Sequence, residues 1–131
     1  RIYAVTDQIS LTQEDIREVQ MAKGAIAAGI ELMMEELEIT YEQVDRVILC
    51  GAFGTYMNAK SAARIGLIPE PLLSKVIAGG NAAGMGCRQI TMDQKLFALT
   101  GELVQKIEPL DLASLPQFQR TFAKQMAFSE V

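Results

Sequence analysis

Two glycine-rich segments hold the residues whose types and spacing best suit ligand binding. Gly51-Ala52-Phe53-Gly54 follows the segment 47–50, and Gly79-Gly80-Asn81-Ala82-Ala83-Gly84-Met85-Gly86 follows the segment 75–78. Neither is a Walker A loop, and neither is a GxGxxG fingerprint with an acid on the next strand. Both can present bare backbone N–H groups to an anion or a flat ring, the second at a predicted helix N-terminus. Two such turns at neighbouring strand ends predict a nucleotide-like ligand.

The candidate binding residues come from these two turns and from one lysine. They are Gly51, Ala52, Phe53, Gly54, Gly79, Gly80, Asn81, Ala82, Gly84 and Lys23. Phe53 suits stacking on a base, and filling a gap in the core is an equal alternative. Lys23 suits contact with a phosphate or an acidic partner across a cleft, and the alternative is a solvated or snorkelling side chain.

The composition excludes several other kinds of chemistry. The chain has no histidine, which excludes Ser-His and Cys-His nucleophile pairs and histidine metal ligands. Cys50 and Cys87 form no CxxC pair, so we expect two buried free thiols in a reducing cytoplasm and no metal site. We assign no catalytic role to the acids at positions 7, 15, 45 and 93, because they fall at predicted caps and turns.

The totals describe one acidic globular domain. The formal charge of −4 and a pI near 4.8 argue against nucleic acid or an anionic membrane as a partner, since both require a basic face. No apolar run approaches the roughly 20 residues of a membrane span, and no signal peptide opens the chain. Because the chain begins at Arg1, we expect residues 1–131 to be a single domain excised from a longer protein.

The two turns need buried strands to position them. Val47-Ile48-Leu49-Cys50 is apolar without alternation, which predicts a parallel strand buried on both faces. A second strand of this kind is expected at 75–78, a shorter third strand at 103–107, and a lead-in strand at 2–5.

Helices are expected to separate these strands. Thr12 caps a long amphipathic helix whose middle, 22–29, is rich in glycine and alanine. Small residues there predict close packing on the sheet, or else the close approach of a ligand or partner. The alternation of strands and helices predicts an α/β fold with a small, mostly parallel sheet flanked by helices.

Three further helices complete the prediction. Asn58 caps a short helix that Gly66 ends, and a longer helix is expected over about 82–100. The last helix is expected to begin near Ser114 and to hold Pro116 in its first turn.

Several segments taken together resemble one known family. They are 15–26, 47–54 with Tyr56, 62–66 with Pro69, 80–86, and the aromatic residues Phe118, Phe122 and Phe128. In this order, and over nearly the whole chain, they resemble the C-terminal domain of the reductive activators of corrinoid proteins.

The resemblance implies a ribonuclease-H-like, actin-like half, that is, a subdomain of the actin/Hsp70/sugar-kinase (ASKHA) fold, in which two related halves enclose ATP. It implies that 51–54 match the adenosine-side loop and that 80–86 match the helix start that closes the site. The chain would then hold half of a site for ATP or ADP with magnesium. In the family, an N-terminal ferredoxin-like domain carries an iron–sulfur cluster that reduces the Co(II) of a corrinoid protein, and ATP hydrolysis assists this step. The implied partners are ATP and a corrinoid protein, with a homodimer as a further possibility.

Departures from the family pattern limit what this chain does alone. The iron–sulfur domain, the phosphate-binding loops and the acid that directs magnesium are absent from it, and Gly51-Ala52 stands where relatives of the fold carry two glycines. We therefore expect no turnover from the chain by itself. One alternative is a dimerisation or docking module, and another is part of a different ATPase or small-molecule kinase of the same superfamily. Open turns favour a nucleotide, whereas turns plugged by Phe53 or Met85 favour a packing role.

Overall fold

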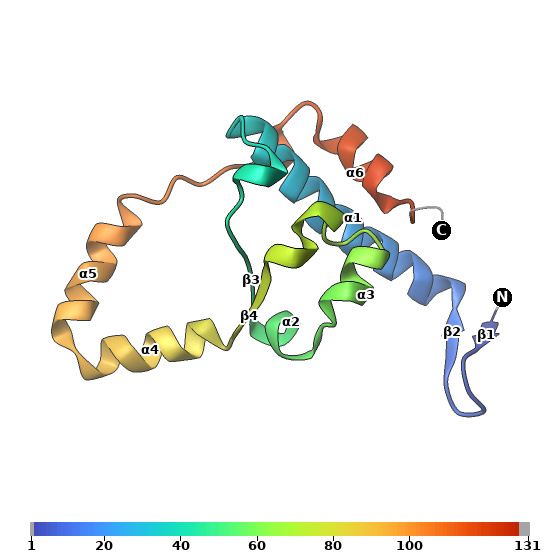
Figure 1. Cartoon of the computed structure of the whole chain (residues 1–131), viewed down its shortest axis with the longest axis horizontal. Helices are drawn as coiled ribbons and strands as arrows, with labels where there is room; N and C mark the ends of the chain where they lie inside the picture. The colour runs from blue at the N-terminus through green and yellow to red at the C-terminus, as the bar shows by residue number, and fades with distance from the viewer. Residues whose placement is uncertain (1, 129–131) are drawn as a thin grey trace.

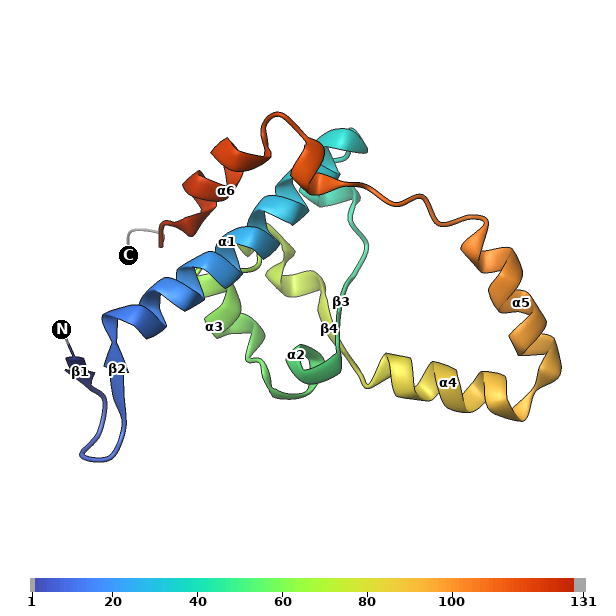
Figure 2. The same cartoon turned by 180° about the vertical axis from the view of Figure 1, so that it is seen from behind.

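The computed structural model describes residues 2–128 as a mixed α/β domain with two small sheets (Figure 1). In chain order the elements are β1 (Ile2–Ala4), β2 (Ser10–Thr12), α1 (Gln13–Glu36), the 3-10 helix η1 (Tyr41–Gln43), β3 (Val47–Cys50), α2 (Gly51–Tyr56), α3 (Ala59–Arg64), the 3-10 helix η2 (Glu70–Lys75), β4 (Val76–Gly80), α4 (Ala82–Met92), α5 (Gln94–Val104), the 3-10 helix η3 (Leu112–Ser114) and α6 (Phe118–Met126). Elements α1, η1, β3, α3, η2, β4 and α6 form a packed body. Helices α4 and α5 form an arm that leaves the ends of the strands and returns through residues 105–111 (Figures 1 and 2).

Helix α1 begins where the sequence predicts it to begin. The Asp15 N–H donates to Thr12 Oγ1 at 3.1 Å, and the Thr12 N–H donates to Asp15 Oδ2 at 2.7 Å. This capping box satisfies two backbone donors that the first turn leaves without a partner in the helix. The hydrogen bonds from Thr12 also lower the pKa of the Asp15 carboxyl, because they stabilise its charged form.

The small residues of α1 pack against α6 and not against the sheet. A Cβ added to Gly24 would lie 3.0 Å from Met126 Cγ and 3.2 Å from the Met126 backbone nitrogen. A Cβ on Gly29 would lie 3.3 Å from Leu112 Cδ1. Close packing at this helix is therefore confirmed, but the predicted partner was wrong.

The strands form two separate sheets and not the single, mostly parallel sheet that the sequence predicts. β3 and β4 run parallel, with Val47 opposite Val76 and Ile48 opposite Ile77, and β1 and β2 form an antiparallel hairpin. The predicted burial of β3 on both faces was wrong, because Ile48 is 56% exposed while Val47 and Leu49 pack against the core. In this structure, other elements cover only one face of the β3–β4 pair.

The expected burial of the two cysteines is also wrong. Cys50 and Cys87 are free thiols, as predicted, but both are exposed and not buried. Met85 and Met92 are also exposed, at 57% and 75%.

The expected helix over about 82–100 is broken in two. Asp93 ends α4 in an extended conformation, and its carboxylate accepts the Lys95 N–H at 2.8 Å to cap α5. The predicted strand at 103–107 was wrong, because α5 continues to Val104 and a turn follows it. Apolar residues there do not make a strand without a neighbouring strand to pair with.

The last helix begins at Phe118 and not near Ser114. Asp111 caps the short η3 by accepting the Ala113 N–H, and Pro116 lies between η3 and α6. Within residues 2–128, no helix is long and apolar enough to cross a membrane.

The core lies where α3, η2 and β3 meet α1. Ala62, Ile68 and Leu72 are buried there, with Ile30 and Leu49 packed against them. α3 starts at its predicted cap, since Asn58 Oδ1 accepts the Ser61 N–H at 3.0 Å. This core holds β3 and β4 in place and so fixes the position of both glycine turns.

Candidate functional site

The two glycine turns lie side by side at the carboxyl ends of the parallel pair. Cys50 is opposite Gly80, with a register shift between Leu49 and Cys50. Gly51 has φ +69° and Gly80 has φ +57°, a left-handed conformation that costs most other residues about 1–2 kcal/mol. In open parallel sheets, ligands bind beyond this end of the strands.

Contacts between the turns are close enough to require glycine. A Cβ on Gly54 would lie 2.0 Å from the Leu49 carbonyl oxygen and 3.3 Å from the Gly80 nitrogen. A Cβ on Gly79 would lie 2.7 Å from Cys50 Sγ. The structure therefore brings together the two turns that sequence reasoning singled out.

Neither turn is an open loop, because each turn is continuous with a helix. Residues 51–54 are the first part of α2, which follows β3 directly. Asn81 caps α4, and its Oδ1 accepts the Gly84 N–H at 2.9 Å. The remaining N–H groups of the first turn of α4 carry the positive end of the helix dipole, which favours an anion.

The surface around the turns is open and apolar. A Cβ on Gly51 or Gly80 would meet no atom within 4 Å, so nothing plugs the turns at these positions. Phe53 is 55% exposed and Met85 57% exposed. The core-filling alternative for Phe53 is therefore wrong in this chain, and its ring is free to stack on a ligand.

Lys23 does not lie with the turns. It is only 1% exposed on α1, and its Nζ donates to the Ala127 carbonyl oxygen at 2.5 Å and lies 5.7 Å from the centre of the Phe128 ring. Burial lowers the pKa of this ammonium group. The alternative of a solvated side chain was wrong, and in this arrangement the ammonium group is directed to the end of α6.

The turns supply binding groups but no acid or base. Neither 51–54 nor 79–86 contains an ionisable side chain. Across residues 2–128, no three His, Cys, Asp or Glu side chains are grouped to hold a metal ion. Backbone donors, a helix N-terminus and an exposed ring can hold a ligand in place, but they cannot activate water for hydrolysis.

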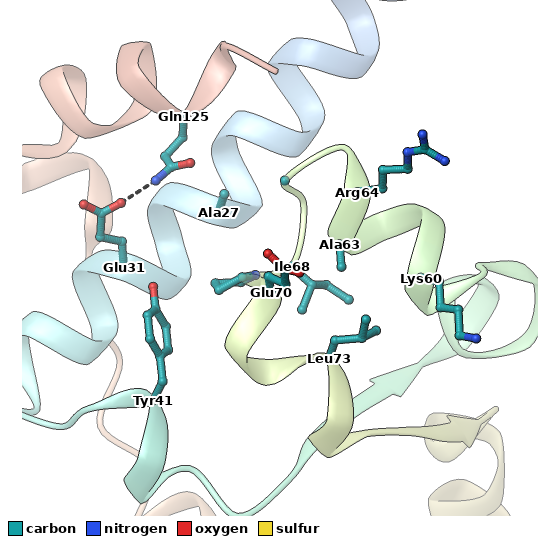
Figure 3. A pocket seen from close by; sticks show the side chains of 12 residues that line it. Ala27, Glu31, Tyr41, Lys60, Ala63, Arg64, Ile68, Glu70, Leu73 and Gln125 are labelled. Carbon is teal, nitrogen blue, oxygen red and sulfur yellow. Dashed lines mark hydrogen bonds between the residues drawn. The ribbon is translucent and has the colours of Figure 1, made fainter. Parts of the chain in front are cut away.

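A cavity of about 470 Å³ lies elsewhere, among α1, η1, α3, η2 and α6 (Figure 3). Its lining includes Glu31, Tyr41, Ile68 and Glu70. Sequence reasoning missed these residues, because they come from distant segments and share no motif.

Known proteins resemble the chain over nearly its full length. The family model described as the C-terminal domain of RACo, the ASKHA domain, matches residues 2–131. The corrinoid activation enzyme RamQ of Eubacterium limosum is 30% identical over 122 residues, which are 93% of this chain and 21% of that protein. The Co(II) methylated amine-specific corrinoid protein reductase of Methanosarcina barkeri is 26% identical over 122 residues, which are 92% of this chain and 22% of that protein.

The chain is also similar to a solved structure. A reductive activator for corrinoid, iron-sulfur protein superposes with a TM-score of 0.84 at 33% identity, over 92% of this chain and 19% of that chain. The chain spans about a fifth of the length of each of these proteins. The match of residues 2–131 shows that the chain belongs to the family of the C-terminal ASKHA domain of RACo, a family of corrinoid activation enzymes.

Proposed function

We propose that this chain supplies the nucleotide half-site of an ATP-dependent reductive activator of a corrinoid protein. One observation carries the proposal: two glycine turns meet at the carboxyl ends of a parallel strand pair, and Gly51 and Gly80 are open to solvent. By "half-site" we mean 51–54 and 79–84, which would bind one side of ATP or ADP with magnesium.

Within this proposal each part of the half-site has a role. The first turn of α4 faces the negative charge of the phosphates, since a helix N-terminus favours an anion. The exposed ring of Phe53 stacks on the base, and the methyl group of Ala52 narrows the site without closing it. Lys23 reaches a ligand only if α6 moves away, because its Nζ is bonded to Ala127.

The proposal includes a larger sheet than the described residues contain. Two-stranded sheets are marginal alone, and Ile48 and Ile77 are 56% and 43% exposed on β3 and β4. We propose that β3 and β4 belong to the sheet of a ribonuclease-H-like, actin-like half and that other strands of the same polypeptide cover this face. A second half would then bring the acid that directs magnesium, so the chain alone would show no turnover.

The activity of the complete protein is part of the same proposal. An iron–sulfur domain outside this chain would pass an electron to inactive Co(II) of a corrinoid protein, and ATP hydrolysis would assist the transfer. The names of the similar proteins, a corrinoid activation enzyme and a corrinoid protein reductase, support this assignment.

Calorimetric titration with ADP or ATP and magnesium tests the half-site. The complete polypeptide should bind tightly, this chain weakly, and Gly51→Val should abolish binding in both, because valine cannot adopt the conformation of Gly51 without strain. A complete polypeptide that binds no nucleotide would contradict the proposal.

The exposed apolar surface supports a second candidate, a dimerisation or docking module without a nucleotide. Phe53, Tyr56 and Met85 are exposed at 55%, 87% and 57%, beside the turns. If this candidate is right, Phe53→Ser would weaken self-association or partner binding, and nucleotide would have no effect on either. A small-molecule kinase of the same superfamily would instead give a phosphorylated sugar or acid, with ATP turnover unaffected by a corrinoid protein.

A further inference from the structure

The cavity in the body is built from five elements. Ala27 and Glu31 come from α1, Tyr41 from η1, and Gln125 from α6, while α3 and η2 close the remaining sides (Figure 3). Its volume of about 470 Å³ falls within the usual range of small-molecule sites, which is roughly 300–1,000 Å³. It lies apart from the glycine turns and is independent of the nucleotide proposal.

The lining is held by contacts that do not depend on a ligand. Ala27 and Ile68 are 4% and 2% exposed, so part of the lining is apolar and packed. The Lys75 ammonium donates to the Tyr41 backbone carbonyl oxygen at 2.7 Å, which ties η1 to η2 and holds the Tyr41 backbone beside the cavity.

The charged groups of the lining are two carboxylates and two cations, and it is their arrangement that favours a cation beside Tyr41. Glu31 and Glu70 contribute carboxylates, and in Figure 3 the Tyr41 hydroxyl points toward Glu31. Lys60 and Arg64 line the opposite side, but both side chains extend away from Tyr41 and Glu31 (Figure 3).

The two carboxylates differ in how far they are neutralised. Glu31 accepts hydrogen bonds from Lys124, at 3.1 Å, and from the Gln125 amide. The Glu70 carboxylate makes no hydrogen bond or ion pair with any other residue among 2–128. Glu70 is exposed and therefore hydrated, and within residues 2–128 no cation pairs with its carboxylate, so it is the carboxylate of the lining that can pair with a ligand.

We propose that the cavity binds a small organic cation, an ammonium group on a short apolar tail. The ammonium group lies between the Glu70 carboxylate and the Tyr41 ring, since carboxylates and aromatic faces both attract cations. The tail lies on Ile68 and Leu73, where burial of its methylene groups adds to the affinity. An anion beside Tyr41 is disfavoured, because it would face the two carboxylates while Lys60 and Arg64 extend away from this position.

Three probes with one carbon skeleton test the charge preference. Butylammonium, butan-1-ol and butyrate are titrated against the complete polypeptide, and binding is followed by saturation-transfer NMR of the probe. Butylammonium should bind saturably, butan-1-ol about three- to fivefold more weakly, and butyrate more weakly still. Absence of saturable butylammonium binding, or equal binding of butyrate, would overturn the proposal.

Three variants of the lining locate the binding. Glu70→Gln should weaken butylammonium binding about three- to fivefold, as expected for loss of an exposed charge pair. Lys60→Met keeps the aliphatic part of the side chain and removes its positive charge, so it is the matched control. It should leave butylammonium binding unchanged or slightly tighter. Ala63→Leu fills the cavity and should abolish binding, and the thermal unfolding midpoint of each variant checks that it is folded. Equal weakening by Glu70→Gln and Lys60→Met, or undiminished binding in a folded Ala63→Leu variant, would contradict the site.

Discussion

The packed body and the arm differ in whether they bury their apolar residues. The body buries Ala27, Ala28 and Leu32 on α1 and Ala62, Ile68 and Leu72 around α3 and η2. The arm buries none of its residues, and Phe97 on α5 is 65% exposed and Met92 on α4 75% exposed. Both regions have amphipathic helices, but only the body provides the second surface that such helices need.

The glycine turns lie at the boundary between these two regions. On one side, the core of the body fixes β3 and β4, and on the other side α2 and α4 are open. The candidate site therefore has one wall that the core holds in place, formed by β3 and β4, and one uncovered wall, formed by α2 and α4. A site of this form is what one half of a larger binding cleft would provide.

The largest expected effect is at Gly54, where α2 packs closely against β3. A Cβ there would lie 2.0 Å from the Leu49 carbonyl oxygen, so Gly54→Ala should lower the free energy of unfolding by about 2–3 kcal/mol through overpacking. Gly86→Ala on α4 is the matched control, because a Cβ there meets no atom within 4 Å. It should be neutral or stabilising by up to about 1 kcal/mol, as for alanine replacing glycine within a helix. Urea unfolding measures both, and equal effects would contradict the close contact of α2 with β3 at Gly54.

A smaller effect is expected at Gly51, where conformation and not space is limiting. Its φ of +69° is unfavourable for alanine, while a Cβ would meet nothing within 4 Å. Gly51→Ala should therefore cost about 1–2 kcal/mol. Gly51→Asn should recover part of this loss, because asparagine tolerates the left-handed conformation better. Without such recovery in urea unfolding, the conformational explanation fails.

Within the body, Gly24 tests the contact between α1 and α6. A Cβ there would lie 3.2 Å from the Met126 backbone nitrogen, so α6 must shift to accept it. Gly24→Ala should cost about 1 kcal/mol net of the gain in helix propensity. Gly101→Ala in α5 has open space around its Cβ and should be neutral or stabilising. A stabilised Gly24→Ala variant would show that α6 does not pack closely in solution.

The smallest effect at neutral pH is expected at Lys23. Lys23→Met replaces a buried charge by an apolar residue of similar length, so the free energy of unfolding should change by less than about 1 kcal/mol. Burial lowers the native pKa of Lys23 below its ordinary value of 10.5. Between the two pKa values the unfolded chain binds more protons, so this group makes stability rise with pH.

The pH dependence provides the sharper measurement at this position. The stability of the wild type relative to Lys23→Met should increase as the pH rises through the lowered native pKa toward 10.5. Urea unfolding at several alkaline pH values measures the difference. A difference that stays constant with pH would contradict the titration of a buried Lys23.

The features that the sequence predicted correctly are local or depend on a simple pattern. Thr12 and Asn58 cap helices through side chains that lie three residues from their partners. The parallel pairing of β3 and β4 follows from two apolar runs separated by a helix, and it places the two glycine turns together.

The features that it missed depend on distant contacts. Lys23 donates a hydrogen bond to the backbone carbonyl of Ala127, 104 positions away, and no local sequence pattern predicts this contact. The burial of β3 was overestimated because an apolar run shows what a strand can bury, but not which neighbours are present to cover it. The false strand at 103–107 has the same cause, since its residues lie in the uncovered arm and have no strand beside them.

The location of nucleotide on the complete polypeptide tests the central claim most directly. Backbone amide exchange, followed by mass spectrometry with and without ADP and magnesium, reports which segments the ligand protects. We predict slower exchange in 51–56 and 80–92, with little change in 60–73, which lines the separate cavity. Protection that is absent from both glycine turns, in a polypeptide that binds ADP, would contradict the account.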